Sequence, residues 1–380
     1  MSDNIRRTLE KLAESSGGAL STNRNSLLGQ AFAGHSGPAL QKMTPGMLGS
    51  SGRTMLGGGI ATPMPAHFGL TPAYAYPPAI AQGLPQWSYV RRRFTRFLTN
   101  LELTELQKSD GLIKQAGIRD TLNKFYYNKS SETANSLLIG SWGKGTQVRP
   151  PRDVDVLFLL PAAEYHRYEQ RTGNKQSQLL QDVKRVLENP YSTTDLIGDR
   201  HVVVMKFAST TAEVAVGFMF NDGIIRVCDT KNGGSYIRNT AQDELAALNS
   251  SDTTYSGNTR ALIKMMKVWQ NEKNVPLKSF VLERLAVEFM HAWEHHFNDV
   301  FYYDWMIRDF YAFLYHKSNG FVTMPGTGEV IALGSDWEFK VKTAYGHASV
   351  ACDHERANNS IAAGEHWKSI FGSMISLGAL

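Results

Sequence analysis

Leu137-Leu138-Ile139-Gly140-Ser141, followed twelve residues later by Asp153-Val154-Asp155-Val156, is the part of the sequence that decides the fold. The first segment is an apolar strand that runs into a Gly-Ser turn. The second is a strand that carries two aspartates at a period of two. Because successive side chains of a strand point to opposite faces of the sheet, Asp153 and Asp155 share one face.

The two aspartates predict a divalent metal site. Two neighbouring carboxylates repel each other unless a cation lies between them, and hard oxygen ligands suit Mg²⁺. Residues 156–160 make the strand apolar enough to be central, where a charge is costly unless it is paired or bound to a metal. We expect Mg²⁺, with Mn²⁺ as an alternative, because such ions reduce the charge of a triphosphate and activate an attacking hydroxyl.

The Gly-Ser turn fits the same chemistry. Gly140 lets the backbone approach a phosphate closely, since it has no Cβ atom. The Ser141 hydroxyl and the nearby backbone N–H groups are donors that suit phosphate oxygens. Gly140 and Ser141 are therefore predicted to bind nucleotide.

The residues after the turn, 143–146, are predicted to form a flexible, polar, cationic loop. This loop is not a Walker P-loop, which needs a glycine five residues before Gly-Lys and a Ser or Thr directly after it. Leu138 holds the earlier position and Gly145 follows Lys144. The sequence therefore excludes an ATPase of the P-loop class.

Length and composition allow a large core in one or two domains, with 380 residues and 42% hydrophobic content. The net charge of +5 is that of a mildly basic protein, as expected for one that handles polyanions. Cys228 and Cys352 lie outside any Cys-x-x-Cys motif, which argues against a disulfide framework and a cysteine zinc site. We expect a cytoplasmic protein without a signal peptide or a membrane span.

Residues 1–85 are predicted to be a low-complexity, disordered leader. From Asn25 to Val90 the only charged side chains of the Lys, Arg, Asp and Glu types are Lys42 and Arg53. Gly, Pro, Ala, Met and Ser dominate, and such a segment cannot easily bury a core.

The remaining chain predicts an α+β fold. Residues 86–240 are predicted to form a core with N-terminal helices and a mixed sheet with flanking helices, and residues 241–380 a helical half. In the first part, the pattern predicts helices at 94–101, 103–126 and 165–187, and strands at 201–207, 212–220 and 224–228. In the second part, it predicts helices at 242–248, 258–271, 279–296 and 303–316, and at 344–371 with breaks.

A third carboxylate is needed if the aspartates are to hold two metal ions. Glu213 is the best choice, because it is the one acid in the otherwise apolar strand around Val214. It would help to position or deprotonate an attacking sugar hydroxyl. Asp199 and Asp222, at predicted turns, are weaker rivals.

An anion site is predicted between two helices of the second part. Lys264 and Lys267 lie off the apolar face of helix 258–271, and Ser279 starts the next helix. A helix N-terminus with a hydroxyl and nearby lysines binds anions. The spacing alone favours two solvated lysines and an ordinary capping serine over such a site.

Together these motifs resemble the bacterial cGAS/DncV-like nucleotidyltransferases, the second-messenger synthases of CBASS antiphage systems within the polymerase-β-like superfamily. The resemblance runs from Phe94 to the C-terminus. Its pieces are residues 97–101, Gly140-Ser141, Gly145-Thr146, residues 153–156, 234–237, 266–269, 276–280 and 367–372. Gly-Ser and Asp-x-Asp mark the superfamily, whereas Lys-x-Trp, Leu-Lys-Ser-Phe and the late Trp-x-x-Ile-Phe-Gly are more specific.

The resemblance implies a two-lobed fold around a nucleotide cleft, with residues 86–240 as the nucleotidyltransferase core and residues 241–380 as the helical lobe. It implies that Asp153 and Asp155 bind Mg²⁺ and that Glu213 is the third acid, at a position where the family more often has Asp. The contacts it implies to the donor triphosphate come from Ser141, Lys267 and Ser279.

We therefore expect an enzyme that joins nucleoside triphosphates, releases pyrophosphate and closes a cyclic di- or trinucleotide second messenger in antiphage signalling. Its expected partners are the triphosphates and CBASS regulatory or effector proteins, with no membrane and no stably bound nucleic acid. One alternative is a synthase of linear oligonucleotides or a terminal RNA nucleotidyltransferase, although no clear RNA-binding extension is present. Another is a silent nucleotide-binding scaffold, against which the intact Asp153 and Asp155 argue.

Overall fold

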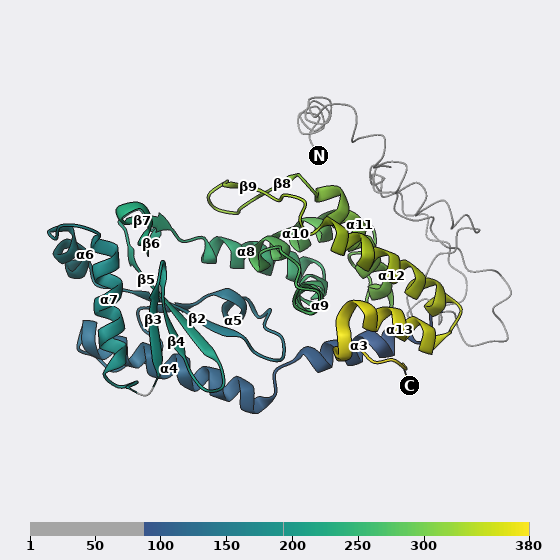
Figure 1. The fold of residues 1–380 in the computed structure, drawn as a ribbon, viewed down its shortest axis with the longest axis horizontal. Helices are drawn as coiled ribbons and strands as arrows, with labels where there is room; N and C mark the ends of the chain where they lie inside the picture. The colour runs from purple at the N-terminus through teal and green to yellow at the C-terminus, as the bar shows by residue number, and fades with distance from the viewer. Residues whose placement is uncertain (1–86, 193, 380) are drawn as a thin grey trace, which may run out of the picture. The chain divides into compact units, whose positions relative to one another are not determined.

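The computed structural model describes residues 87–192 and 194–379, apart from the side chain of Asp199. The predicted leader at residues 1–85 lies outside the described residues. Within them, the sheet and its flanking helices come first in the chain and a helical half follows (Figure 1). The predicted α+β class is confirmed.

Seven strands form one mixed sheet. They are β1 (Ser136–Leu138), β2 (Asp153–Leu159), β3 (Asp195–Asp199), β4 (Val202–Lys206), β5 (Thr211–Met219), β6 (Ile225–Asp229) and β7 (Ser235–Arg238). The order is β1-β2-β5-β4-β3, and β6 pairs with both β5 and β7. Only the β2–β5 pair is parallel among these described strands. β3 and β7, which the sequence analysis missed, are short strands with polar ends.

One face of the sheet carries the larger core. Val154 and Phe158 on β2 and Val214 on β5 point to this face, as the period of two requires. Helices on this side are α4 (Glu105–Tyr127), α6 (Ala162–Glu169) and α7 (Lys175–Glu188). The other face has a smaller apolar cluster around Leu157 and Ala215.

The helix predicted at 165–187 is wrong, because the chain forms two helices there. Gly173 has a φ of +76°, which a residue with a side chain rarely adopts. Asn174 then caps α7 by accepting a hydrogen bond from the backbone N–H of Ser177. A glycine followed by a capping residue therefore divides the amphipathic stretch.

The helical half comprises α8 (Ala241–Thr254), α9 (Asn258–Glu272), α10 (Ser279–Ala292), α11 (Tyr303–Lys317), α12 (Glu338–Arg356) and α13 (Ser360–Phe371). A hairpin of β8 (Phe321–Thr323) and β9 (Val330–Ala332) lies between α11 and α12 in the chain. The remaining short elements are α5 (Gly140–Lys144), η3 (Lys231–Gly233), η4 (Val300–Tyr302) and η5 (Gly372–Met374). No helix within 87–192 or 194–379 has the length and apolar character needed to cross a bilayer.

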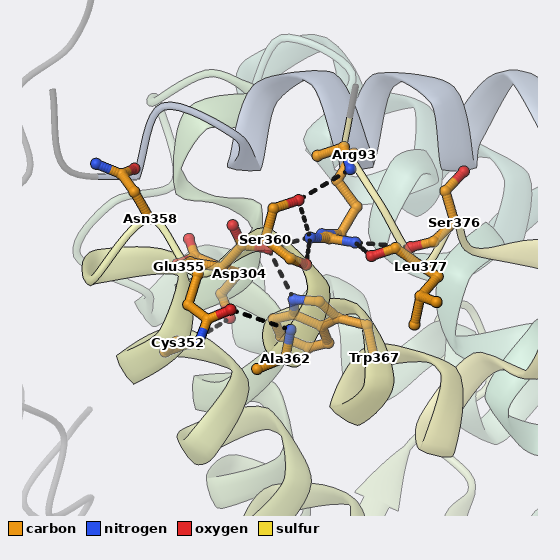
Figure 2. A network of polar contacts seen from close by, with 12 residues as sticks. Arg93, Asp304, Cys352, Glu355, Asn358, Ser360, Ala362, Trp367, Ser376 and Leu377 are labelled. Atoms are coloured by element: carbon orange, nitrogen blue, oxygen red, sulfur yellow. Dashed lines mark hydrogen bonds and ion pairs between the residues drawn. The ribbon is translucent and has the colours of Figure 1, made fainter. Parts of the chain in front are cut away.

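Helix α3 (Val90–Leu101) packs against the helical half through a buried arginine (Figure 2). The Arg93 guanidinium donates to Glu355 Oε1 at 2.7 Å, to the Ser360 carbonyl at 2.6 Å and to the Ser376 carbonyl at 2.6 Å. Trp367 Nε1 donates to the same Glu355 oxygen at 3.2 Å. The network ties α3 to α12 and α13. Helix α3 therefore packs with the helical half, although it belongs to the part of the chain, residues 86–240, that is assigned to the sheet-bearing core. The boundary at residue 240 stays a prediction.

Candidate active site

The three predicted acids leave the same face of the sheet. Asp155 on β2 is the register partner of Glu213 on the parallel strand β5, and Asp153 precedes Asp155 by two residues. Neighbouring strands lie roughly 4.8 Å apart, so the carboxylates of Asp155 and Glu213 start from adjacent backbone positions. All three side chains are half-buried. The structure therefore brings together the acids that the sequence analysis selected.

The pKa of the Asp155 carboxyl is strongly perturbed. Burial, followed by the neighbouring Glu213 and Asp153 carboxylates, raises this pKa to about 7. Lys267 and Lys144 oppose the shift, which places both cations within electrostatic range of Asp155. Three repelling acids with insufficient positive charge form a site that a divalent cation would stabilise.

Gly140 gives the Asp155 carboxylate its position. Its φ is +58°, and a Cβ atom at Gly140 would lie 1.8 Å from Asp155 Oδ2. The backbone N–H of Ile139 also donates to the Asp155 carbonyl at 3.2 Å. The Gly-Ser turn and the acid pair are thus in direct contact, and only a glycine fits at their junction.

The donor set fits Mg²⁺ or Mn²⁺, because carboxylate oxygens are the ligands that these ions prefer. As the side chains stand in the described part of the chain, no three His, Cys, Asp or Glu groups converge closely enough to hold an ion. The carboxylates of Asp153, Asp155 and Glu213 would have to turn toward a shared ion. Because the three residues share one face and lie at adjacent backbone positions, rotation about side-chain bonds is enough for this movement.

The rivals for the third acid lie elsewhere. Asp222 is in the turn between β5 and β6 and forms an ion pair with Arg226 at 2.7 Å. This ion pair holds the pKa of the Asp222 carboxyl below its usual value. Asp199 is predicted at a turn, but it is the last residue of strand β3.

Lys144 is not part of a flexible cationic loop, so that prediction is wrong. Residues 140–144 form the short helix α5, which ends at Gly145 with a φ of +67°. The Lys144 ammonium is buried and lies 2.8 Å from Glu283 Oε2 and 2.5 Å from Glu244 Oε2. The backbone carbonyl of Lys144 accepts a hydrogen bond from Arg260 Nε at 2.8 Å.

Lys267 is buried as well, which removes the solvated alternative for this residue. Its Nζ atom lies 2.6 Å from Glu283 Oε1 and donates to Thr146 Oγ1 at 2.8 Å. Lys264, by contrast, reaches Glu102 at 2.6 Å. Lys267 is therefore the lysine of α9 that belongs to the acid-bearing site.

Ser279 is the first residue of α10 rather than its N-cap, which is Lys278. The Ser279 hydroxyl donates to Gln270 Oε1 at 2.9 Å. Gln270 follows Lys267 by three residues, and Glu283 follows Ser279 by four, so each pair shares a helix face. The contacts Lys267–Glu283 and Gln270–Ser279 therefore lie one helical turn apart along the interface between α9 and α10.

Sequence reasoning missed Glu283, although a signal for it exists. Glu283 lies on a helix close to Val281, Leu282 and Leu285, all three of which are buried. A similar criterion, an acid beside apolar residues in the sequence, selects Glu213. What the sequence does not show is the partner, because Lys144 is 139 residues away.

Comparisons with known proteins bear on the family and the fold of this chain. The model of a family described as Second Messenger Oligonucleotide or Dinucleotide Synthetase domain (SMODS) matches residues 89–251. The chain is similar to the solved Vibrio cholerae DncV cyclic AMP-GMP synthase in complex with the linear intermediate 5' pppA(3',5')pG. The TM-score is 0.60 at 13% identity, over 77% of this chain and 97% of that chain.

A second similar structure is that of the E. coli MS115-1 CdnC:HORMA-deltaN complex. The TM-score is 0.55 at 14% identity, over 75% of this chain and 98% of the other. At such identities the likeness shows the fold alone. No curated protein matches the sequence.

Proposed function

We propose that this protein makes a cyclic di- or trinucleotide from nucleoside triphosphates, because residues 89–251 match the model of the Second Messenger Oligonucleotide or Dinucleotide Synthetase domain and the chain is similar in fold to the DncV synthase. The observation that carries the proposal is the acid trio. Asp155 and Glu213 are register partners, Asp153 shares their face, and Gly140 borders Asp155. Phosphoryl transfer needs this juxtaposition of carboxylates and a close backbone turn.

The proposed reaction is a nucleotidyl transfer. A ribose hydroxyl oxygen of one nucleotide attacks the α-phosphorus of another, and a new phosphodiester P–O bond forms. The bond from the α-phosphorus to the bridging oxygen of the β-phosphate breaks, and pyrophosphate leaves. A final transfer of the same kind, within the linear di- or trinucleotide, closes the ring.

The residues of the chain have separate parts in this proposal. Asp153, Asp155 and Glu213 would hold Mg²⁺ or Mn²⁺, which when bound reduces the charge of the polyphosphate and acidifies the attacking hydroxyl. Glu213 would also orient that hydroxyl or take its proton. Gly140 and Ser141 would line the phosphates, and Lys267 and Ser279 would contact the far end of the triphosphate.

We also propose a signalling role with a protein partner. CdnC was solved with a HORMA protein, and this chain shares that fold. A regulatory or effector protein of an antiphage system is therefore the kind of partner to seek. Co-purification from cells that express the chain with its neighbouring genes tests this point, and recovery of the chain alone would argue against it.

Product analysis tests the proposed activity. The full chain is incubated with Mg²⁺ or Mn²⁺ and mixed nucleoside triphosphates, and the products are treated with phosphatase and identified by mass spectrometry. A small product that resists phosphatase is expected, since a ring has no terminal phosphate. A phosphatase-sensitive ladder would instead indicate a linear synthase, extension of added RNA a terminal transferase, and no product a silent scaffold.

A further inference from the structure

The lysine assigned to the triphosphate already has an anion inside the protein. Lys267 Nζ lies 2.6 Å from Glu283 Oε1, 2.8 Å from Thr146 Oγ1 and 3.3 Å from the Thr146 carbonyl. An ammonium group has three N–H donors, so these three acceptors use all of them. Lys267 is only 8% exposed. A phosphate oxygen can therefore reach its hydrogens only by replacing one of the present acceptors.

Glu283 is the acceptor whose chemistry most resembles a phosphate. Besides Lys267 it contacts the Lys144 ammonium at 2.8 Å and accepts from the Thr146 hydroxyl at 3.1 Å. The two lysines hold the pKa of the Glu283 carboxyl below its ordinary value despite its burial. The buried carboxylate is thus a permanent negative charge shared by two cations.

This charge cluster lies beside the acid site. Lys267 and Lys144 both act electrostatically on Asp155, whose carboxylate borders Gly140. A polyphosphate chain that reaches the acid site consequently enters the field of Lys267. The present anion of Lys267 comes from α10 of the helical half, whereas Thr146 follows α5 on the side of the sheet.

We propose that Glu283 is an internal substitute for the triphosphate, which neutralises Lys267 in the empty enzyme and yields this contact when a polyphosphate binds. The inference rests on the proposed function and adds a basis for substrate selection. Displacement of Glu283 from Lys267 costs a buried ion pair, and a ligand must bring several negative charges to offset that cost. The exchange favours triphosphates over monophosphates.

Loss of the Glu283 carboxylate should destabilise the empty protein and strengthen the binding of polyphosphate. In Glu283→Gln, Lys267 would be buried without its carboxylate in the empty protein, which is an unfavourable state. A bound polyphosphate would restore the missing negative charge. The variant should therefore be less stable than wild type when empty but should bind polyphosphate more tightly.

The test is calorimetric titration of the full chain with inorganic tripolyphosphate in the presence of Mg²⁺. For Glu283→Gln we expect a Kd at least about tenfold lower than for wild type, and a lowered Tm that tripolyphosphate restores. Adenosine monophosphate should show a smaller gain. The matched control is Glu244→Gln, which removes a carboxylate 2.5 Å from Lys144 and should leave the Kd within about threefold of wild type.

A second variant covers a failure of Glu283→Gln to fold. Glu283→Asp keeps the charge but shortens the side chain by one methylene, so it should loosen the contact with Lys267 and also lower the Kd. An unchanged or higher Kd in the folded variants would overturn the proposal, since Glu283 would then only position Lys267. If wild type turns over nucleotides while these affinities stay equal, only this inference fails. If neither wild type nor variants bind tripolyphosphate, the proposed triphosphate site fails with it.

Discussion

Asp155 on β2 and Glu213 on β5 are partners in the only parallel strand pair of the described seven-stranded sheet, and their carboxylates leave the same face. Burial of Asp155, followed by its repulsion from Glu213 and Asp153, raises the pKa of its carboxyl to about 7. A site with this property is unfavourable when empty and becomes favourable when a cation binds.

Loss of the carboxylate at Glu213 should affect chemistry more than folding. Glu213→Gln keeps the size of the side chain but removes a metal ligand and a candidate base. We expect turnover to fall by about 10²-fold or more, because general bases typically contribute 10²–10⁴-fold. Steady-state pyrophosphate release measures this. Glu213→Asp should retain part of the activity, and equal activity of all three proteins would exclude Glu213 from the site.

Gly140→Ala should abolish activity through the position of Asp155. The added Cβ would lie 1.8 Å from Asp155 Oδ2, so the carboxylate must move. Gly145→Ala is the matched control, since Gly145 also has a positive φ but a Cβ there would be 3.5 Å from Arg260. Both variants should lose about 1 kcal/mol or more of folding stability from backbone strain.

Urea unfolding and turnover of these two glycine variants separate strain from site geometry. We expect Gly145→Ala to keep most of its activity and Gly140→Ala to lose it. Comparable activity in both would show that Asp155 does not depend on its contact with Gly140.

The pH dependence of stability without metal should reveal Asp155. Its carboxyl pKa is raised from 3.8 to about 7 in the folded state, so the native protein binds more protons than the unfolded chain in this range. Stability is then lost as the pH rises from about 4 through 7 and levels off above. Asp155→Asn should remove this loss and be more stable than wild type at pH 8 by an amount on the order of a few kcal/mol.

Urea unfolding in EDTA at pH 5 and pH 8 measures this difference. Addition of Mg²⁺ should stabilise wild type more at pH 8 than at pH 5, because the ion binds the ionised acids. It should have a much smaller effect on Asp155→Asn. If metal stabilised both proteins equally, the ion would bind elsewhere.

Arg93 should prove essential for stability rather than for chemistry. Its guanidinium is fully buried and bonded to Glu355 and to carbonyls near the C-terminus. Arg93→Met leaves the Glu355 carboxylate buried without its counter-charge, which should cost about 3–5 kcal/mol. The neighbouring Arg92 is exposed, so Arg92→Met should change stability by less than about 0.5 kcal/mol. Thermal unfolding of the two variants checks this contrast.

The acid trio could be predicted because its determinants are local. Asp153 and Asp155 alternate with buried valines, and Glu213 is the only acid in an apolar strand. Because side chains alternate between the two faces of a strand, this pattern places each acid on the face opposite the buried valines beside it. The parallel pairing of β2 with β5 could not be read from period two, since it depends on the crossover between them. The resemblance to a family supplied the expectation that these strands meet.

The charge cluster around Glu283 could not be predicted for a different reason. Lys144 looked like a loop cation because it lies between two glycines, yet it is buried against acids from α8 and α10. Ion pairs between residues 100 and 139 positions apart leave no local pattern. Likewise, the break at Gly173 lies within a continuous amphipathic pattern, and its positive φ is a property of the tertiary structure.

Pyrophosphate release by the double variant Asp153→Asn/Asp155→Asn tests the central claim most directly. The assay uses mixed nucleoside triphosphates with Mg²⁺, and the control is Asp222→Asn, which removes an exposed acid paired with Arg226. We expect wild type and the control to release pyrophosphate at similar rates, and the folded double variant to release none above background. Release by the double variant at the wild-type rate would contradict the assignment of nucleotidyl transfer to these acids.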